Sequence, residues 1–525
     1  MKQLKKLTML ALAALCLLFP SAALAEPDKN NYQSVPFLSE GALVPEVLLV
    51  LSKDHKMFQQ AYNPIIDFDG DGFVDTGYNP SVVYYGYFDS YSCYTYSSSN
   101  LNKDGDRNAY FYRVGPTIDD ESTVTRPPAS VLPLYIPAPR AVHHERSKQA
   151  GEKIGICQMP NSGGGNFSGN WLNFLVTSRF DVIRKVLYGG LRSTDQSNFT
   201  ILEGSMVPTD AHVWGYDVMA DDRWVKDTPQ SVYYDVSKYT PYAKPGTNRA
   251  HFFARTRSFG NTNFPIFRYL LNTDHVYFTG TMHASLSSNT PEGRFWDWSL
   301  NERPNPNDGL LETYWVNAPG EVKGMTVRVQ ACKKDSFSET EGCKEYTPGT
   351  YKPVGLLQQH GEGDKMFFGL MTGSYHDAYR RQGGVLRHHI DSINSAVNPV
   401  DGTIIDRGLI WTLDRLRIVG RGDGTITSST NYNYTNASAW GSPIGEMLFE
   451  GVRYMAGLDA PSSGYLPPNE VAITTSASTQ PSFLKTWGGR PALAGSDECA
   501  KPVILLISDL DNDFDGDNFP TADFG

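Results

Sequence analysis

The stretch Pro45 to Asp75, PEVLLVLSKDHKMFQQAYNPIIDFDGDGFVD, joins an apolar run directly to an acidic loop. Val47 to Leu51 are all apolar, and a short run without alternation is what a strand covered on both faces of a parallel sheet requires. A second such run, Val503 to Ile507, lies near the other end of the chain in KPVILLISDLDND. Ligands collect beyond the carboxyl ends of strands in open α/β sheets. Two buried strands that both end in Ser and Asp therefore predict one site built from distant segments.

The segment Asn170 to Tyr188 is the clearest helix in the sequence, with Gly189 and Gly190 as a left-handed stop. Arg179 and Lys185 fall away from its apolar face, and we expect that face to pack on the central sheet. The predicted inner face comprises Leu172, Leu175, Val176, Val182, Ile183, Val186 and Leu187.

The α/β pattern returns late in the chain, where Lys365 to Met371 and Gly384 to Ile390 are predicted strands. A helix is predicted from Pro443 to about Met455, with Ser442 as its N-cap. Its expected inner face comprises Ile444, Met447, Leu448 and Val452. The predicted fold class is therefore α/β, with a doubly wound, mostly parallel sheet and large β-rich insertions. The sequence leaves open whether this core is complete.

The rest of the chain divides by composition. Lys2, Lys5 and Lys6 precede an apolar run that ends in Ala23-Leu24-Ala25, the pattern of a cleaved secretory signal. The region from Ser193 to about Lys352 is mostly β, and Met325 to Cys332 alternates like a half-buried strand. The predicted divisions are 1–25 signal peptide, 26–57 lead-in and first strand, 58–169 loop-rich calcium-binding insertion, 170–192 first helix, 193–352 β-rich insertion and 353–525 remainder of the α/β domain.

Six cysteines and a net charge of −11 limit the classes of function. In an oxidising compartment Cys332 with Cys343 is the first expected disulfide, because only a short loop separates them, and Cys93 with Cys157 is the second. Cys16 lies in the predicted signal, so Cys499 is then left over, as a free thiol or with a partner outside this chain. The acidic balance argues against nucleic acid and suits divalent cations. No segment after the signal is apolar enough to span a bilayer.

The loop after the first strand has the spacing of a calcium loop. Asp67, Asp69 and Asp71 stand at positions 1, 3 and 5, Phe73 stands where a carbonyl is needed, and Asp75 stands at position 9. Hard oxygen ligands at alternating positions suit a large divalent cation. Tyr78 occupies position 12 in place of an acid, so a complete site needs a remote acid or water. The alternative is a solvated Asp-Gly turn.

Two further loops repeat the pattern less completely. Asp511, Asp513 and Asp515 with Gly516 have the same spacing, and calcium and a plain acidic turn are equal alternatives there. A third and weaker version is formed by Asn102, Asp104 and Asp106. A polar turn is the favoured interpretation of that loop.

Several segments together resemble the amino-terminal half of the PilY/PilC proteins, calcium-dependent adhesins and assembly factors at the tip of bacterial type IV pili. They are PEVLLVL, FSGNWLNF with SRFDVIRKVLYGGLRSTD, PTDAHVWG, KMFFGLM with GGVLRHHI, SPIGEMLFEG and VILLISD. The resemblance implies a von Willebrand factor A-like domain with large insertions. It makes Lys365 to Met371 and Gly384 to Ile390 an antiparallel edge pair, and Val503 to Ile507 the fourth strand. The family's propeller would follow Gly525, so propeller functions are not carried over.

The resemblance also implies a metal site of Asp-x-Ser-x-Ser, Thr and Asp, and this sequence departs from it. The first loop reads Ser52, Lys53, Asp54, His55, Lys56, so the acid and both serines are lost from their positions. Ser442 stands in for the Thr, and Asp509 is kept. We therefore expect this adhesion-type metal site to be degenerate, with Ca²⁺ held in the Asp67 to Asp75 loop.

The leading interpretation is a non-enzymatic, calcium-binding adhesin or assembly factor of type IV pili, acting by protein–protein contact at the pilus tip. Its expected partners are minor pilins or pilus tip proteins, with a host or surface receptor as a further option. Its expected route is the Sec pathway to the periplasm and then the cell surface. The alternatives are a calcium-stabilised extracellular polysaccharide hydrolase, since aromatic residues are abundant, and a passive surface-layer protein.

Overall fold

The structure of this 525-residue chain is a computed structural model. The described residues are 44–62, 77–80, 82–117, 155–157, 166–207, 215–219, 235–247, 249–257, 264–274, 321–334, 336–337, 341–374, 383–416, 443–462, 484, 487–488 and 502–508. The predicted signal peptide, Cys16 and Cys499 lie outside them.

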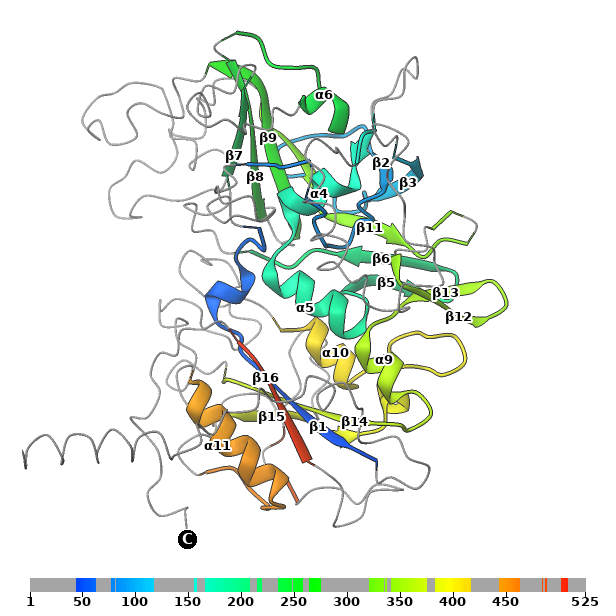
Figure 1. Ribbon diagram of the computed structural model, residues 1–525, viewed down its shortest axis with the longest axis vertical. Coiled ribbons are helices and arrows are strands. Elements are labelled where there is room, and N and C mark those ends of the chain that lie inside the picture. Colours follow the sequence, from blue (N-terminus) through cyan, green and yellow to red (C-terminus); the bar gives the residue numbers. More distant parts are fainter. Residues whose placement is uncertain are drawn as a thin grey trace, which may run out of the picture.

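A four-stranded sheet forms the lower part of the molecule, with the strand order β15-β14-β1-β16 (Figure 1). Strand β1 pairs in parallel with β14 on one side and with β16 on the other, so that Leu48 lies opposite both Gly369 and Ile504. Strand β15 is antiparallel to β14. The bounds are β1 Glu46–Leu51, β14 Phe367–Thr372, β15 Val385–Asp391 and β16 Pro502–Ile507. The two apolar runs from opposite ends of the chain therefore lie side by side, as the sequence predicts.

The alternating side chains of β1 enter two separate cores. Leu48 and Val50 pack with Met447 and Tyr454 of α11 (Ile444–Met455) on one face of the sheet. On the other face Leu49 joins a cluster built from three helices and a short 3₁₀ turn. These elements are α5 Arg179–Tyr188, α9 Leu356–Gly361, α10 Leu409–Asp414 and η6 Ile393–Ser395. Because both faces are covered, an uninterrupted apolar strand is stable at this position.

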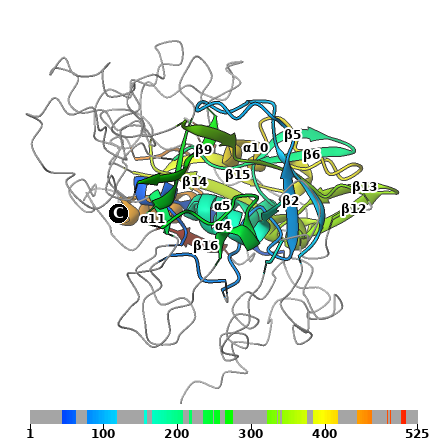
Figure 2. The same cartoon turned by 90° about the horizontal axis from the view of Figure 1, so that it is seen from above.

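The upper part of the molecule is mostly β and has its own core (Figure 1). A six-stranded sheet has the order β4-β2-β3-β11-β6-β5, and a four-stranded sheet has the order β10-β9-β8-β7. The bounds are β2 Ser92–Tyr96, β3 Phe111–Pro116, β4 Phe167–Ser168, β5 Arg192–Gln196, β6 Phe199–Glu203, β7 Gly215–Met219, β8 Arg249–Arg257, β9 Pro265–Asp274, β10 Lys323–Thr326 and β11 Arg328–Ala331. A separate hairpin, β12 Cys343–Thr347 with β13 Thr350–Pro353, lies at the periphery when the molecule is seen from above (Figure 2).

The single strand predicted from Met325 to Cys332 is wrong, because it is two strands in two different sheets. Strand β10 pairs with β9, and β11 pairs with β6 and β3. Val327 lies between them, donates from its N–H to the carbonyl of Pro265 and accepts from the N–H of Gly204. Its buried side chain packs in the upper core. The alternation continues across Val327, so sequence pattern alone does not show the change of sheet.

The single helix predicted from Asn170 to Tyr188 is also wrong. The structure has α4 (Gly169–Val176) and α5, separated at Thr177 and Ser178. Ser178 caps α5 through a capping box, in which its hydroxyl accepts from the N–H of Asp181 and the Asp181 carboxylate accepts from the N–H of Ser178. Gly189 ends α5 in the left-handed conformation, as expected, with φ of 92°.

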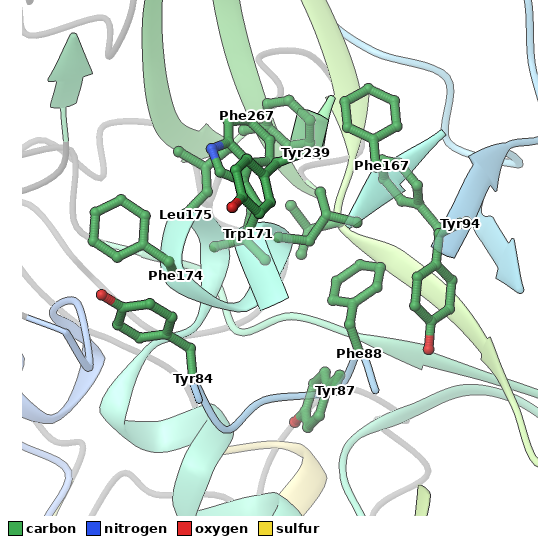
Figure 3. Close-up of a cluster of buried hydrophobic side chains, with 14 of the residues drawn as sticks. Tyr84, Tyr87, Phe88, Tyr94, Phe167, Trp171, Phe174, Leu175, Tyr239 and Phe267 are labelled. Atoms are coloured by element: carbon green, nitrogen blue, oxygen red, sulfur yellow. The ribbon is translucent and has the colours of Figure 1, made fainter. Parts of the chain in front are cut away.

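The two helices enter different cores. Trp171 of α4 contacts Phe253 of β8 edge to face at 5.0 Å, inside the upper aromatic core and away from the central sheet (Figure 3). Only α5 packs on the central sheet, through Phe180, Leu187 and Tyr188. The expected face of α5 is rotated, since Lys185 is buried whereas Val182, Ile183 and Val186 are only partly buried. The prediction that this whole segment covers the sheet holds for its second half alone.

Helix α11 ends at Met455 as predicted, but it begins at Ile444, so Pro443 and not Ser442 is its N-cap and no side chain caps it. Its inner face also differs from the predicted one. Met447 is buried as expected, whereas Val452 is 58 % exposed. The remaining buried positions are Glu446, Glu450, Gly451 and Tyr454. Glu450 accepts from the hydroxyl and the N–H of Ser462, and Glu446 accepts from the N–H of Gly383. These bonds replace the water that two buried carboxylates lose, which is why charged residues occupy the inner face.

Both predicted disulfides are present, Cys93–Cys157 and Cys332–Cys343. The first ties β2 to the segment 155–157, and the second closes the turn between β11 and β12. The remaining short elements are η1 His55–Phe58 and α6 Val236–Tyr239. Within the described residues, no helix has the length and apolar character needed to cross a membrane.

Candidate functional site

The carboxyl edge of the central sheet brings together polar residues that follow two strands. Ser52, Lys53 and Asp54 follow β1, and Ser374 lies two residues beyond the end of β14. The N–H of Ser52 donates to the carbonyl of Ile507 at 2.9 Å, so β1 and β16 remain paired up to this edge. All four side chains are buried. The polar residues that follow β1 and β14 therefore lie at the same edge of the sheet.

The two predicted residues of the first loop bond to the local backbone. The Asp54 carboxylate accepts from the N–H of Lys56 at 2.9 Å and caps η1. The Ser52 hydroxyl accepts from the N–H of Asp54 at 3.1 Å. These bonds fix the direction in which the chain leaves the sheet.

Two buried basic side chains stand at the same edge. Lys53 passes over Gly373, where a β-carbon would lie 3.5 Å from the Lys53 Cε. Arg387 of β15 donates to the Thr372 hydroxyl at 2.9 Å and to the Gly373 carbonyl at 3.0 Å. Positive charge at short range in a buried setting disfavours a divalent cation. The basic character of the first loop is visible in the sequence, whereas Arg387 was not expected at this edge, because it lies in a predicted edge strand.

The other predicted metal residues lie outside the described residues. They are Asp67, Asp69, Asp71, Phe73, Asp75, Asp511, Asp513 and Asp515, with Ser442 and Asp509 of the adhesion-type site. Of all the predicted ligands, the structure thus describes and brings together only Ser52 and Asp54.

The weakest predicted loop, Asn102 to Asp106, is described and forms a polar turn. Asn102 accepts from the N–H of Asp104, and Asp106 accepts from the N–H of Asn108 and the hydroxyl of Ser98. The buried guanidinium of Arg268 donates to the Asp104 carboxylate at 3.0 Å and to the Lys103 carbonyl at 2.7 Å. Burial lowers the pKa of Arg268 to about 10, so the group remains charged at neutral pH. An internal cation thus neutralises this loop.

The segment that follows the Asp67 to Asp75 loop is anchored to α4 by two buried asparagines. Asn170 accepts from the N–H of Tyr84 and donates to the Tyr78 hydroxyl and the Val82 carbonyl. Asn173 accepts from the N–H of Phe88 and donates to the carbonyls of Tyr84 and Phe88. The sequence signal was present, since polar Asn at a three-residue spacing interrupts the apolar NWLNFLV run.

A buried charged network joins α5 to α10 and to the segment after β6. Arg184 donates to the Ser205 hydroxyl and to the carbonyls of Leu413 and Leu416. The Ser205 N–H and hydroxyl both donate to the Asp181 carboxylate at 2.7 Å. Because Asp181 also caps α5, one carboxylate connects the two halves of the molecule.

One group of residues in the described ranges has the composition of a metal site. Cys332, Glu341 and Cys343 each offer a ligand atom, and these atoms lie within 4.8 Å of one another. The two cysteines are joined as a disulfide in this structure. The Glu341 carboxylate accepts from the N–H of Cys332 at 2.9 Å.

Two family models match separate parts of the chain. The model described as "PilY1 homolog, second domain" matches residues 368–525, which include β15, α10, α11 and β16. The model described as "PilY1 homolog, small alpha/beta domain" matches residues 75–117 and 143–265. The chain belongs to the PilY1-like family.

Two curated proteins of Xylella fastidiosa are similar to the chain, and each is named a type IV pilus biogenesis factor PilY1 homolog. One is 28 % identical over 501 residues, which cover 89 % of this chain and 28 % of that protein. The other is 27 % identical over 310 residues, which cover 59 % of this chain and 19 % of that protein. The chain thus spans less than a third of the length of these PilY1 relatives. No solved structure matches it.

Proposed function

We propose that this chain is a secreted, non-enzymatic component of type IV pili that acts as an adhesin or assembly factor through protein–protein contact at the pilus tip. The observation that carries the proposal is the match of two PilY1 homolog models to different parts of the chain. The names of the Xylella relatives support a role in pilus biogenesis. Its partners would be minor pilins or other tip proteins, with a host or surface receptor as a further partner. The Sec pathway would deliver it to the periplasm and then to the cell surface.

We further propose that the central sheet is a von Willebrand factor A-like domain carrying large insertions. The order β15-β14-β1-β16, with β15 antiparallel and the other strands parallel, supports this assignment. The upper sheets are then insertions into this domain. Their separate core is consistent with that organisation.

The adhesion-type metal site of this domain is proposed to be degenerate. Lys53 and Arg387 place two buried positive charges at the edge where the cation would bind. Asp54 caps η1 through its carboxylate. Ser442 and Asp509 would complete the remnant of the site.

Calcium is proposed to bind in the Asp67 to Asp75 loop instead, through the side chains of Asp67, Asp69, Asp71 and Asp75 and the carbonyl of Phe73. The anchoring of Tyr78 and Tyr84 on Asn170 supports this, because it would hold the end of the loop in place. A fixed end reduces the entropy that a flexible loop loses on binding. The Asp511 to Asp515 loop is a second, weaker candidate for Ca²⁺.

Isothermal titration with Ca²⁺ tests the calcium assignment. The double substitution Asp69→Ala and Asp71→Ala is expected to abolish the tightest binding event. Asp104→Ala is the matched control, because that loop is neutralised by Arg268, and it should leave the isotherm unchanged. An unchanged affinity after the double substitution would remove calcium from the Asp67 to Asp75 loop.

Piliation and twitching test the functional assignment in the organism that encodes the chain. Deletion is expected to reduce both, and complementation with the natural sequence is expected to restore them. Normal pili and normal twitching in the deletion strain would contradict a role in assembly. A strain that keeps its pili but loses attachment would favour the adhesin role over assembly.

The polysaccharide hydrolase and surface-layer alternatives receive no specific support. The aromatic residues that suggested stacking on sugars include Tyr84, Phe88, Tyr94 and Trp171, and these are buried in the upper core (Figure 3). A glycan panel remains a direct test of the hydrolase alternative, and turnover of any glycan would contradict the non-enzymatic assignment.

A further inference from the structure

The turn between β11 and β12 holds two sulfur atoms and a carboxylate in one place. Cys332 directly follows β11, and Cys343 is the first residue of β12. The Glu341 Oε2 atom lies 2.9 Å from the backbone nitrogen of Cys332 and 3.9 Å from the Sγ of Cys343. Both cysteines lie at the ends of strands, and their Cα atoms are 5.6 Å apart.

The second disulfide of the chain has different surroundings. The sulfur of Cys93 faces two backbone carbonyls, those of Pro116 and Ile156, at 3.6 and 3.9 Å. Cys93 and Cys157 are both buried, at 0 % and 2 % exposure, whereas Cys343 is partly exposed. Among the described residues, the only group of three metal-ligating side chains is the one formed by Cys332, Glu341 and Cys343. Cys93–Cys157 therefore serves as a reference disulfide that no described carboxylate joins as a third ligand.

Two thiolates and a carboxylate form a ligand set that suits Zn²⁺, which binds sulfur and oxygen in tetrahedral geometry and leaves a fourth position for water. The ion requires deprotonated sulfur, so it cannot bind to the disulfide form in this way. The same residues can therefore be bridged by a covalent bond or by a cation, but not by both at once.

We propose that Cys332, Glu341 and Cys343 form a redox-gated zinc site, closed when the two sulfurs are bonded and open when they are reduced. A dithiol reductant supplies two electrons and two protons, the S–S bond breaks to give two thiols, and the reductant becomes a disulfide. Zn²⁺ then binds both sulfurs and releases their two protons. The Glu341 carboxylate is the third ligand, and water is the fourth. Either state keeps the turn between β11 and β12 closed.

The position of the turn favours selective opening. The β12–β13 hairpin lies at the periphery of the molecule, away from the central sheet (Figure 2). Thiol–disulfide exchange requires access of the attacking group to a sulfur atom. Mild reduction should therefore open the Cys332–Cys343 bond before the fully buried Cys93–Cys157 bond.

The test uses the full chain with its free thiols first blocked by iodoacetamide. A phosphine reductant, which adds no competing thiol, then opens the accessible disulfide, and mass spectrometry of an alkylated portion identifies the two cysteines released. After removal of reductant without oxygen, the chain is titrated with Co²⁺ and then Zn²⁺. We expect one Co²⁺ per reduced chain, with the visible absorption of tetrahedral cobalt–thiolate, its displacement by Zn²⁺, and no such absorption before reduction.

Three variants assign the ligands. Glu341→Gln removes the carboxylate but not the disulfide. It should weaken Co²⁺ binding by at least about 10-fold, because even the loss of a group that only supports a metal ligand typically costs that much. Glu321→Gln is the control, since its side chain is 80 % exposed and it is not part of the Cys332, Glu341 and Cys343 group. Cys332→Ser together with Cys343→Ser should abolish the cobalt–thiolate absorption.

Several outcomes would overturn the proposal. They are the absence of Co²⁺ binding to the selectively reduced chain, equal affinity in the Glu341→Gln variant, and thiolate absorption that persists in the double serine variant. Loss of the circular dichroism of the folded chain on reduction, with no recovery on addition of Zn²⁺, would equally show that no folded zinc site exists.

Discussion

Asp414 shows how a single buried carboxyl can set the pH dependence of this molecule. It lies at the end of α10 and accepts a hydrogen bond from the Tyr188 hydroxyl at 2.7 Å. Burial raises the pKa of Asp414 from 3.8 to about 6, against the lowering effect of Arg184, Tyr188, Arg192 and Arg415. The folded chain therefore holds this proton more tightly than the unfolded chain does. Its contribution to stability is present below pH 4 and is lost as the pH rises through 6.

The Asp414→Asn substitution tests this effect. The amide keeps an acceptor for Tyr188 but never ionises, so the variant should be more stable than the natural chain at pH 7 by up to roughly 3 kcal/mol, with little difference at pH 4. Urea unfolding at the two pH values measures the change. Asp401→Asn is the control, because hydrogen bonds to Thr403 and Ser197 lower the pKa of Asp401 and give the opposite pH dependence. An equal loss of stability at both pH values would show that the Asp414 charge has no role.

At the residue scale, the sequence predicts the disulfides and the apolar strands better than it predicts which polar side chains are buried. Cys332–Cys343 follows from cysteine spacing and the expected compartment, and Cys93–Cys157 was the second expected pair. Asn170, Arg184 and Arg387 were not identified as buried, because polar residues are usually at the surface. Asn170 and Arg184 have partners more than 80 residues away, and Arg387 bonds to Thr372 and Gly373 of the neighbouring strand segment. Such partners are set by the tertiary fold, which a local pattern does not contain.

At the scale of elements, the break between α4 and α5 is the most informative difference from expectation. Apolar residues continue across Thr177 and Ser178, so hydrophobic periodicity alone predicts one helix. The local signal for a new helix was nevertheless present, as Ser178 and Asp181 have the three-residue spacing of a capping box. The spacing of a capping box thus marks a boundary that hydrophobic periodicity does not show.

The Ser178→Ala substitution should destabilise the chain by about 1–2 kcal/mol, because it removes the cap of α5 and one partner of the Asp181 carboxylate. Urea unfolding followed by circular dichroism measures the loss. Ser178→Thr, which keeps the hydroxyl, is the matched comparison and should retain most of the stability. A loss that is equal in both variants would point to packing rather than capping.

Helix α11 gives a second element-scale test, because sequence assigned Val452 to its inner face. Val452→Lys should change stability by less than about 0.5 kcal/mol, since the side chain is largely exposed and Lys is the better helix former. Met447→Lys should cost more than about 3 kcal/mol, because it buries a charge against β1 and β14. Thermal unfolding of the two variants side by side measures the difference. Similar losses would place both residues on the buried face.

For the whole molecule, sequence predicted the most distant contact correctly and the division of cores incorrectly. The apolar runs of β1 and β16 identified neighbouring strands, because strands of parallel sheets have a distinctive apolar composition. The expectation that both runs are buried holds for β1 alone, since β16 is an edge strand on which Val503 and Leu505 are exposed. The aromatic core around Trp171 was not predicted. Its members come from many short segments, none of which is periodic enough to indicate burial.

The separation of the cores predicts that the two parts of the molecule have different stability. Removal of residues 502–525 deletes β16 and should expose β1, so amide protection in 367–372 and 46–51 should fall sharply. Protection in β6, which belongs to the upper part, should fall much less. Hydrogen exchange read by mass spectrometry compares the two regions. A uniform loss of protection would indicate one cooperative unit.

Because β1 lies between β14 and β16, it remains without its partner strands until late in synthesis. A ribosome adds roughly 5–20 residues per second, so on the order of half a minute passes between the making of β1 and the making of its last neighbour. During that interval the five aliphatic residues of β1 are unpaired and can form a sheet with a strand of another chain. The molecule is therefore expected to need a holding chaperone early in its life, and a shortage of that chaperone would reduce its yield before any property of the finished fold could matter.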